Sequence, residues 1–258
     1  MLLTVQGAEV WCDTGDQDFD PTRPTVVFIH GALNDHSVWT AQSRHFAAQG
    51  YGVLALDLPG HGQSAGPAKT SVPAMAEWLL ALLDAAGVQQ AALVGHSMGS
   101  LIALETAGTA PRRVSHLAMI GTAFPMRVAD TLLEMARNDE PRAIGMVAKW
   151  SHTPGHASLD ELRELMLRLA QQNPEHLLHT DLVACNSYDH GGVAAKALRC
   201  PALIIFGAGD VMTPPNAARS LIDDIVHAHT LTLEGGHALM AEQSGPIIAA
   251  LANFIGNR

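Results

Sequence analysis

The stretch that decides the fold reads Ala91-Ala92-Leu93-Val94-Gly95-His96-Ser97-Met98-Gly99-Ser100. Its first four residues predict a short buried strand, the G-x-S-x-G pentapeptide predicts a tight turn, and the apolar run from Leu101 predicts a helix. Gly95 and Gly99 suit this turn because larger side chains would collide with neighbouring backbone. The turn would expose the hydroxyl of Ser97 and direct the first amides of the helix toward it. Ser97 is therefore a candidate nucleophile, and the alternative is a serine that only caps the helix.

Short apolar runs rich in Val, Ile and Leu recur on both sides of this stretch and alternate with segments of helical periodicity. Such runs suit strands buried on both faces, and the alternation predicts an α/β fold with a mostly parallel, doubly wound sheet. The predicted strands span residues 25–29, 53–56, 91–94, 114–120 and 202–206, a hairpin pairs 2–5 with 9–12, and helices are expected at 72–86 and 100–108.

One interval, residues 122–190, breaks this alternation because it shows helical patterns but no buried strand. Within it, Ser158 and Glu161 form a capping-box pattern that predicts a helix start, and Asn173-Pro174 has the pattern of another. We expect one domain over residues 1–258, with a helical cap at 122–190 inserted between core strands over the C-terminal edge of the sheet. Ordinary crossover helices are the alternative.

Composition narrows the classes of function. The chain has 258 residues, 48% hydrophobic and 16% charged, which gives enough apolar surface for a folded core. Its formal net charge of −10 repels phosphate backbones and anionic lipid, so we expect no nucleic-acid or membrane partner. No apolar stretch approaches the roughly 18 residues of a membrane span. Cys12, Cys185 and Cys200 are widely spaced without a CxxC pair, which favours reduced thiols in a cytoplasmic protein.

A serine hydroxyl needs a base and an orienting carboxylate to act as a nucleophile at neutral pH. His237 is the predicted base because it follows a strand-like run through two glycines. Asp210 is the predicted acid because it follows an apolar strand, which would bring it to the same sheet edge as Ser97. Asp189, at the end of the helical interval, is the reserve candidate for the acid.

An acyl-transfer site also needs two backbone amides to bind the oxyanion that forms on the substrate. The amides of Met98, directly after the serine, and of Ala32, in the loop after the strand 25–29, are predicted for this role. An apolar pocket is expected beside them, formed by loop and cap residues whose alternative role is packing. The candidate pocket residues are Leu33, Met126, Trp150 and Met212.

Two histidine pairs, His152 with His156 and His176 with His179, have ligand-like spacing on helical segments. A zinc site needs at least a third ligand, so solvated histidines are the preferred interpretation. We expect no metal and no organic cofactor.

Five segments together resemble the α/β-hydrolase fold superfamily, and the resemblance covers nearly the whole chain. They are Phe28-Ile29-His30-Gly31, similar to the oxyanion strand and loop, the D-x-P-G-H-G-x-S turn at 57–64, the elbow at 95–99, the acid loop at 207–210 with Pro214, and Gly236-His237. The order Ser97, Asp210, His237 is that family's order of nucleophile, acid and base. The resemblance also implies a cap between the sixth and seventh strands, which corresponds to residues 122–190.

Differences from particular subfamilies narrow the expected chemistry. Ser97 stands where haloalkane dehalogenases and epoxide hydrolases have an aspartate, which disfavours displacement at an alkyl carbon. The loop at 32–36 lacks the H-G-G-P-G pattern of proline iminopeptidases and the G-x-G-P-G pattern of C–C bond hydrolases. We therefore expect a serine hydrolase that cleaves small to medium apolar carboxylic esters or thioesters through an acyl-enzyme. A non-hydrolytic ligand-binding receptor, and a lyase or perhydrolase on the same fold, are the alternatives.

Overall fold

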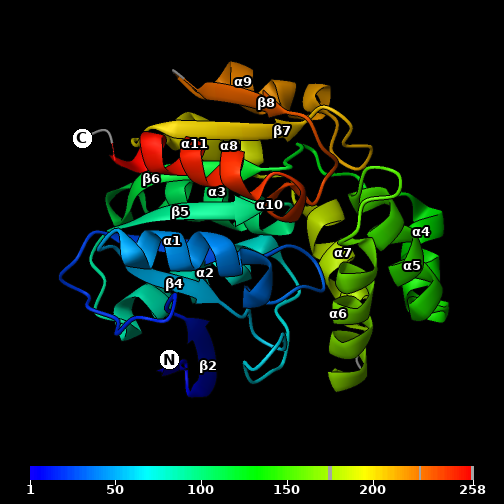
Figure 1. Ribbon diagram of the computed structural model, residues 1–258, viewed down its shortest axis with the longest axis horizontal. Coiled ribbons are helices and arrows are strands. Elements are labelled where there is room, and N and C mark those ends of the chain that lie inside the picture. The colour runs from blue at the N-terminus through cyan, green and yellow to red at the C-terminus, as the bar shows by residue number, and fades with distance from the viewer. Residues whose placement is uncertain (174–175, 227, 257–258) are drawn as a thin grey trace.

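An eight-stranded sheet forms the centre of the computed structural model, which describes residues 1–173, 176–226 and 228–256 (Figure 1). The strand order is β1-β2-β4-β3-β5-β6-β7-β8. The β1–β2 hairpin and its junction with β4 are antiparallel, and every pairing from β4 to β8 is parallel. The strands are β1 (Leu2–Val5), β2 (Ala8–Asp13), β3 (Thr25–Ile29), β4 (Gly52–Leu56), β5 (Ala91–His96), β6 (Val114–Ile120), β7 (Ala202–Gly207) and β8 (His229–Leu233).

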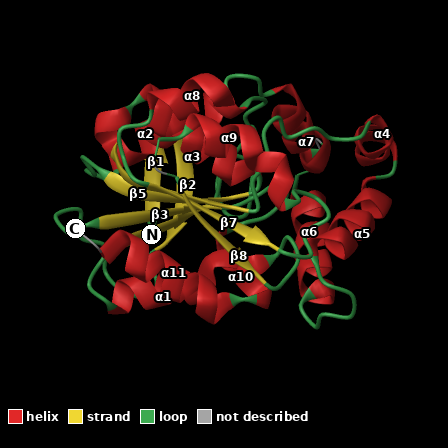
Figure 2. Ribbon diagram, turned by 90° about the horizontal axis from the view of Figure 1, so that it is seen from above, coloured by secondary structure: helices red, strands yellow, loops and turns green. Residues whose placement is uncertain are grey.

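Helices cover both faces of this sheet (Figure 2). One face carries α1 (Thr40–Ala48), α10 (Leu239–Glu242) and α11 (Ser244–Gly256), and the other carries α2 (Val72–Ala85), α3 (Met98–Thr109), α8 (Gly191–Ala197) and α9 (Arg219–Asp224). Short 3-10 turns occur at η1 (His36–Trp39), η2 (Pro111–Arg113) and η3 (Pro215–Ala218).

The central strands are buried on both sides, as their continuous apolar runs predict. Every residue of β3, β4, β5 and β7 is buried. Successive side chains alternate between two clusters, because Val27 and Leu93 pack with residues of α2 and α3 while Phe28 and Val94 pack with residues of α1 and α11. The predicted doubly wound α/β architecture is therefore confirmed.

The segment between β6 and β7 contains helices and, among its described residues, no strand. Before α8, which packs on the sheet, its helices are α4 (Asp130–Asn138), α5 (Glu140–Ser151), α6 (Leu159–Gln172) and α7 (Leu177–Ser187). Both views show these four helices gathered at one end of the sheet, and we call them the helical insertion. The insertion has an apolar cluster of its own, in which Ile144, Leu169 and Leu178 are buried.

Two helix boundaries in the insertion differ from the sequence patterns. Helix α6 begins after Ser158 as predicted, but the Ser158 side chain makes no capping hydrogen bond. Its hydroxyl instead donates to Nδ1 of His156 at 2.8 Å, so a local contact replaces the expected cap. Asn173 ends α6 as its C-cap and does not start the next helix, and Pro174 lies outside the described residues.

The three cysteines are free, and Cys12 and Cys185 are buried. Burial raises the pKa of the Cys12 thiol to about 12 and that of Cys200 to about 11, so neither thiol is activated. In the described part of the chain, no helix is both long and apolar enough to cross a membrane.

Candidate active site

Ser97 sits on a strained turn between β5 and α3. Its backbone has φ 52° and ψ −118°, in the left-handed half of the φ range that branched or bulky residues avoid. A Cβ on Gly95 would overlap the carbonyl oxygen of Gly99, and a Cβ on Gly99 would overlap that of Ile29. The Ser97 amide donates to the Ile120 carbonyl at 3.0 Å, which fixes the turn to β6. The two glycines are therefore required by close backbone approach, as the pentapeptide predicts.

His237 and Asp210 are brought together from the loops that follow β8 and β7. Nδ1 of His237 lies 2.8 Å from Oδ2 of Asp210, and both side chains are nearly fully buried. The other oxygen, Oδ1, accepts the amides of Met212 and Thr213, each at 2.8 Å. A carboxylate can only accept here, so Nδ1 of His237 donates to Asp210, and Nε2 is the ring nitrogen left for another partner.

Electrostatics favour an ionised Asp210. Burial alone would raise the pKa of this carboxyl, but hydrogen bonds from His237 and Thr213 and the charge of the imidazole hold it well below its usual range. The Thr213 hydroxyl donates to Oδ2 at 2.7 Å and lies 3.1 Å from Nδ1 of His237. The pair thus has the orientation and charge needed to stabilise an imidazolium.

His96, which is adjacent to Ser97 in sequence, supports the histidine loop. Its Nε2 donates to the carbonyl oxygen of His237 at 3.0 Å, and the two rings lie 4.6 Å apart between centroids. Burial, followed by the neighbouring charge of His237, lowers the pKa of His96 to about 3. His96 is therefore neutral and is not a candidate base.

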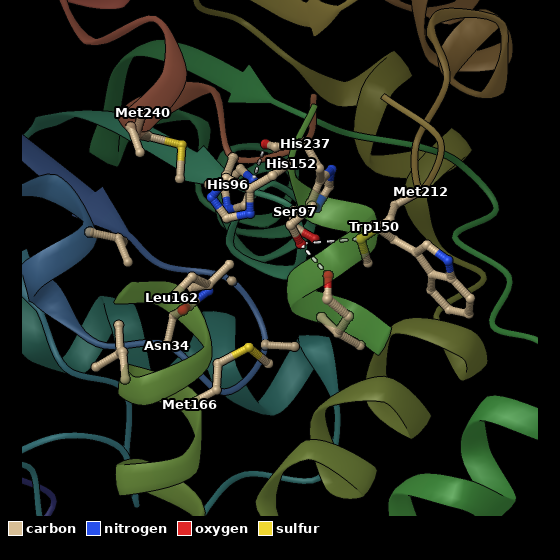
Figure 3. Close-up of a pocket in the computed structure, with 18 of the residues that line it drawn as sticks. Asn34, His96, Ser97, Trp150, His152, Leu162, Met166, Met212, His237 and Met240 are labelled. Carbon is tan, nitrogen blue, oxygen red and sulfur yellow. Dashed lines mark hydrogen bonds between the residues drawn. The ribbon is translucent and has the colours of Figure 1, made fainter. Parts of the chain in front are cut away.

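Ser97 and His237 line the same cavity, whose volume is about 970 Å³ (Figure 3). Among the hydrogen bonds of the described residues, none joins their side chains directly. Such contacts are often long in proteins without substrate and tighten when substrate binds. Asp189, the reserve acid, is exposed and does not line this cavity, so Asp210 is the carboxylate that the fold brings to His237.

The loop after β3 runs beside the elbow, because a Cβ on Gly31 would lie 3.2 Å from the Cβ of Ser97. Nδ1 of His30 donates to the carbonyl oxygen of Gly31 at 2.8 Å, and Nε2 of His30 accepts the amide of Leu58 at 3.1 Å. Burial, then the nearby charge of His61, lowers the pKa of His30 to about 4, which agrees with this neutral tautomer. In the described residues no backbone acceptor takes the Ala32 amide, and Met98 is the first residue of α3, whose amide has no partner within the helix.

A family model for the alpha/beta hydrolase fold matches residues 24–243. The chain belongs to the alpha/beta hydrolase family. RutD of Klebsiella pneumoniae, a candidate carbamate hydrolase, is 32% identical over 231 residues, which cover 84% of this chain and 86% of RutD. The dihydrolipoyllysine-residue acetyltransferase component of the acetoin cleaving system of Pseudomonas putida is 27% identical over 256 residues, and the match covers 95% of this chain and 66% of that protein. The crystal structure of the enol-lactonase from Burkholderia xenovorans has a TM-score of 0.87 at 21% identity, with 100% of each chain covered, which shows the same fold.

The cavity of this alpha/beta hydrolase is lined mainly by apolar side chains of the insertion and of the loops beside it. Three of the four predicted pocket residues, Met126, Trp150 and Met212, lie in its wall. Leu33 does not, and that prediction is wrong. With φ 47°, the Leu33 backbone directs the side chain into the apolar cluster of the insertion, where it is fully buried. The other apolar wall residues include Val128, Leu132, Met135, Met146, Val147, Leu162, Leu165, Met166 and Met240.

Two contacts tie the histidine loop of this hydrolase to the end of α5, and sequence patterns did not reveal them. The Ala238 amide donates to the Ser151 carbonyl at 2.7 Å. The carboxylate of Glu242 accepts the Gly236 amide at 2.6 Å and the Thr153 amide at 2.6 Å. Because Ser151 and Thr153 are more than 80 residues away from Ala238 and Glu242 in sequence, no local pattern predicts that the two segments meet.

Among the residues that the structure describes, neither histidine pair belongs to a group of three possible metal ligands. The rings of His152 and His156 stack with 5.9 Å between centroids, and Nδ1 of His152 donates to the Ala148 carbonyl at 2.9 Å. Within the described residues, the one group with three possible metal ligands is Asp35, His36 and Asp57. There, Asp57 already accepts both the amide and Nδ1 of His36, at 2.7 and 2.8 Å.

Proposed function

We propose that this alpha/beta hydrolase is a serine hydrolase that cleaves carboxylic esters or thioesters of small to medium apolar substrates through an acyl-enzyme. One observation carries the proposal. His237, hydrogen-bonded through Nδ1 to Asp210, borders the same cavity as Ser97, which lies on its strained turn. Nucleophile, base and orienting carboxylate are the groups that acyl transfer requires.

In the proposed cycle, the Ser97 oxygen attacks the substrate carbonyl carbon while His237 Nε2 takes the hydroxyl proton. The amides of Ala32 and Met98 stabilise the oxyanion, and Asp210 stabilises the imidazolium. His237 then protonates the departing alcohol or thiol, which breaks the acyl bond and leaves an acyl-serine. Water activated by His237 attacks this acyl-serine and releases the acid and free Ser97.

The proposed substrate class follows from the cavity. Its wall is mainly apolar, and methionine side chains adapt to varied shapes. We infer that the insertion acts as the cap that encloses the substrate. RutD and the enol-lactonase are named for acyl compounds, a carbamate and a lactone, and both bond types suit the same nucleophile.

The partner in this proposal is a small molecule. The acidic net charge disfavours nucleic acid and anionic membrane surfaces as partners. Free thiols with raised pKa values suit a reducing compartment, so we place the protein in the cytoplasm.

A fluorophosphonate probe and a p-nitrophenyl ester series with increasing acyl length test the proposal. We expect labelling and turnover by the wild-type protein and neither by Ser97→Ala. The same panel includes a thioester, a lactone and a carbamate, so that kcat/KM can be compared among the types of acyl bond. Ligand binding without alcohol release would indicate a receptor instead, and cleavage of a cyanohydrin while esters are ignored would indicate a lyase. Formation of peracetic acid from acetate and hydrogen peroxide, detected by oxidation of bromide, would indicate a perhydrolase.

A further inference from the structure

Asp181 joins the helical insertion to the loop that carries the predicted oxyanion amide. It lies on α7, is fully buried, and its Oδ2 accepts the backbone amide of Leu33 at 2.8 Å. The same oxygen lies 2.9 Å from Nε2 of His61, in the turn after β4. Three segments separated by 120 and 148 residues in sequence therefore meet at one carboxylate oxygen.

The partners of His61 define its charge. Nδ1 lies 3.1 Å from the Pro59 carbonyl, which can only accept, and Nε2 faces the Asp181 carboxylate. Both ring nitrogens therefore donate, as in an imidazolium. Burial alone would lower the pKa of His61, but the charge and hydrogen bond of Asp181 outweigh it and raise the pKa. A buried carboxylate paired in this way resists leaving its position, because separation would expose two uncompensated charges.

This pair acts on the peptide that follows Ala32. His30 holds the peptide before Ala32 through the Gly31 carbonyl, and Asp181 holds the peptide after it through the Leu33 amide. Because each peptide unit is planar, fixing one atom on either side constrains the direction of the Ala32 amide. The Leu33 side chain is also buried in the cluster of the insertion.

We propose that Asp181, paired with His61, is a positioning residue that sets the oxyanion hole from the insertion. The proposal rests on the serine hydrolase function proposed above. Asp181 does not line the cavity, so it acts on the transition state through the loop and not on substrate binding. A donor displaced by about 1 Å can cost about 100-fold in rate, which sets the scale of the expected effect.

Asp181→Asn is the test variant, because it keeps the shape of the side chain and removes the charge. We expect kcat for a p-nitrophenyl ester to fall about 10- to 100-fold with KM within about threefold, since loss of a whole donor costs about 10²–10³. Glu105→Gln is the matched control. Glu105, on α3, is another buried carboxylate, is bonded to Tyr188 and His190, and does not line the cavity, so its variant should keep kcat within about twofold.

A thionoester analogue separates positioning from general damage. The oxyanion hole stabilises a developing oxygen anion and favours sulfur much less, so a displaced donor lowers ester turnover more than thionoester turnover. A folded Asp181→Asn protein that keeps kcat, raises only KM, or loses both turnovers equally would overturn the inference. Should that variant fail to fold, His61→Gln is judged by the same ester-to-thionoester ratio. Ester turnover by Ser97→Ala would instead overturn the proposed function itself.

Discussion

The sheet edge and the helical insertion contribute different chemistry to one cavity. At the sheet edge, polar side chains stand where strands end, with Ser97 after β5, Asp210 after β7 and His237 after β8. The insertion supplies mostly apolar side chains to the wall, such as Val147 and Trp150 of α5. Parallel strands place their C-terminal ends together whatever covers them, so in the proposed mechanism topology positions the reacting groups and the insertion shapes what reaches them. Mutations should separate these contributions.

The largest expected effect is at the sheet edge. Ser97→Ala and His237→Ala should each lower kcat by about 10⁵-fold or more, and the double variant should be no worse, because such groups act as a unit. Steady-state kinetics on a p-nitrophenyl ester measures this, with circular dichroism to confirm folding. If the two single losses were small and additive, the acyl-enzyme mechanism would be wrong.

The second-largest effect is expected at Asp210, the carboxylate of the sheet edge, and Asp189, at the end of the helical interval, is its control. Asp210→Asn should lower kcat by about 10⁴-fold, because Asn cannot stabilise the imidazolium or hold its tautomer. Asp189→Asn should leave kcat within about twofold, since that side chain is exposed and does not line the cavity. Equal losses in the two variants would contradict the acid assignment.

These positions were predictable from sequence because each follows a strand in a fixed order. An apolar run followed by glycines marks the end of a buried strand, and parallel strands gather those ends. The fold and the approach of Asp210 to His237 followed from that rule. The rule about strand ends does not extend to Leu33, which lies within a loop. The loop sets its backbone φ of 47°, and hydrophobic periodicity does not predict the direction of its side chain.

Residues that act between distant segments were not predicted. Thr213 contacts His237, 24 residues away, and Glu242 accepts the amide of Thr153, 89 residues away, yet neither contact has a local signature. Asp181 does carry a weak signal, because it interrupts the apolar face of α7 formed by residues such as Leu178 and Leu182. A charged residue on a buried helix face calls for a partner, but only the fold shows that the partner is His61.

A moderate effect is expected where the sheet edge meets the insertion. Glu242→Gln should lower kcat about 10-fold, because Gln offers one acceptor oxygen where the carboxylate receives the amides of Gly236 and Thr153 on two. Glu234→Gln, at an exposed position in the same loop, is the matched control and should change nothing. Unaltered kcat in a folded Glu242→Gln protein would show that His237 keeps its position without the two hydrogen bonds of the Glu242 carboxylate.

The smallest effect is expected inside the insertion and should depend on the substrate. Each methylene that packs on Trp150 contributes about 0.8 kcal/mol, or about fourfold in kcat/KM, so Trp150→Ala should weaken the preference for longer acyl chains and spare acetate. Leu133→Ala, in the same insertion but outside the cavity wall, should leave the chain-length profile unchanged. The profile of p-nitrophenyl esters measures both variants. If Trp150→Ala lowered acetate and long-chain turnover by the same factor, the side chain would support the reacting groups, and the division between sheet edge and insertion would not hold at α5.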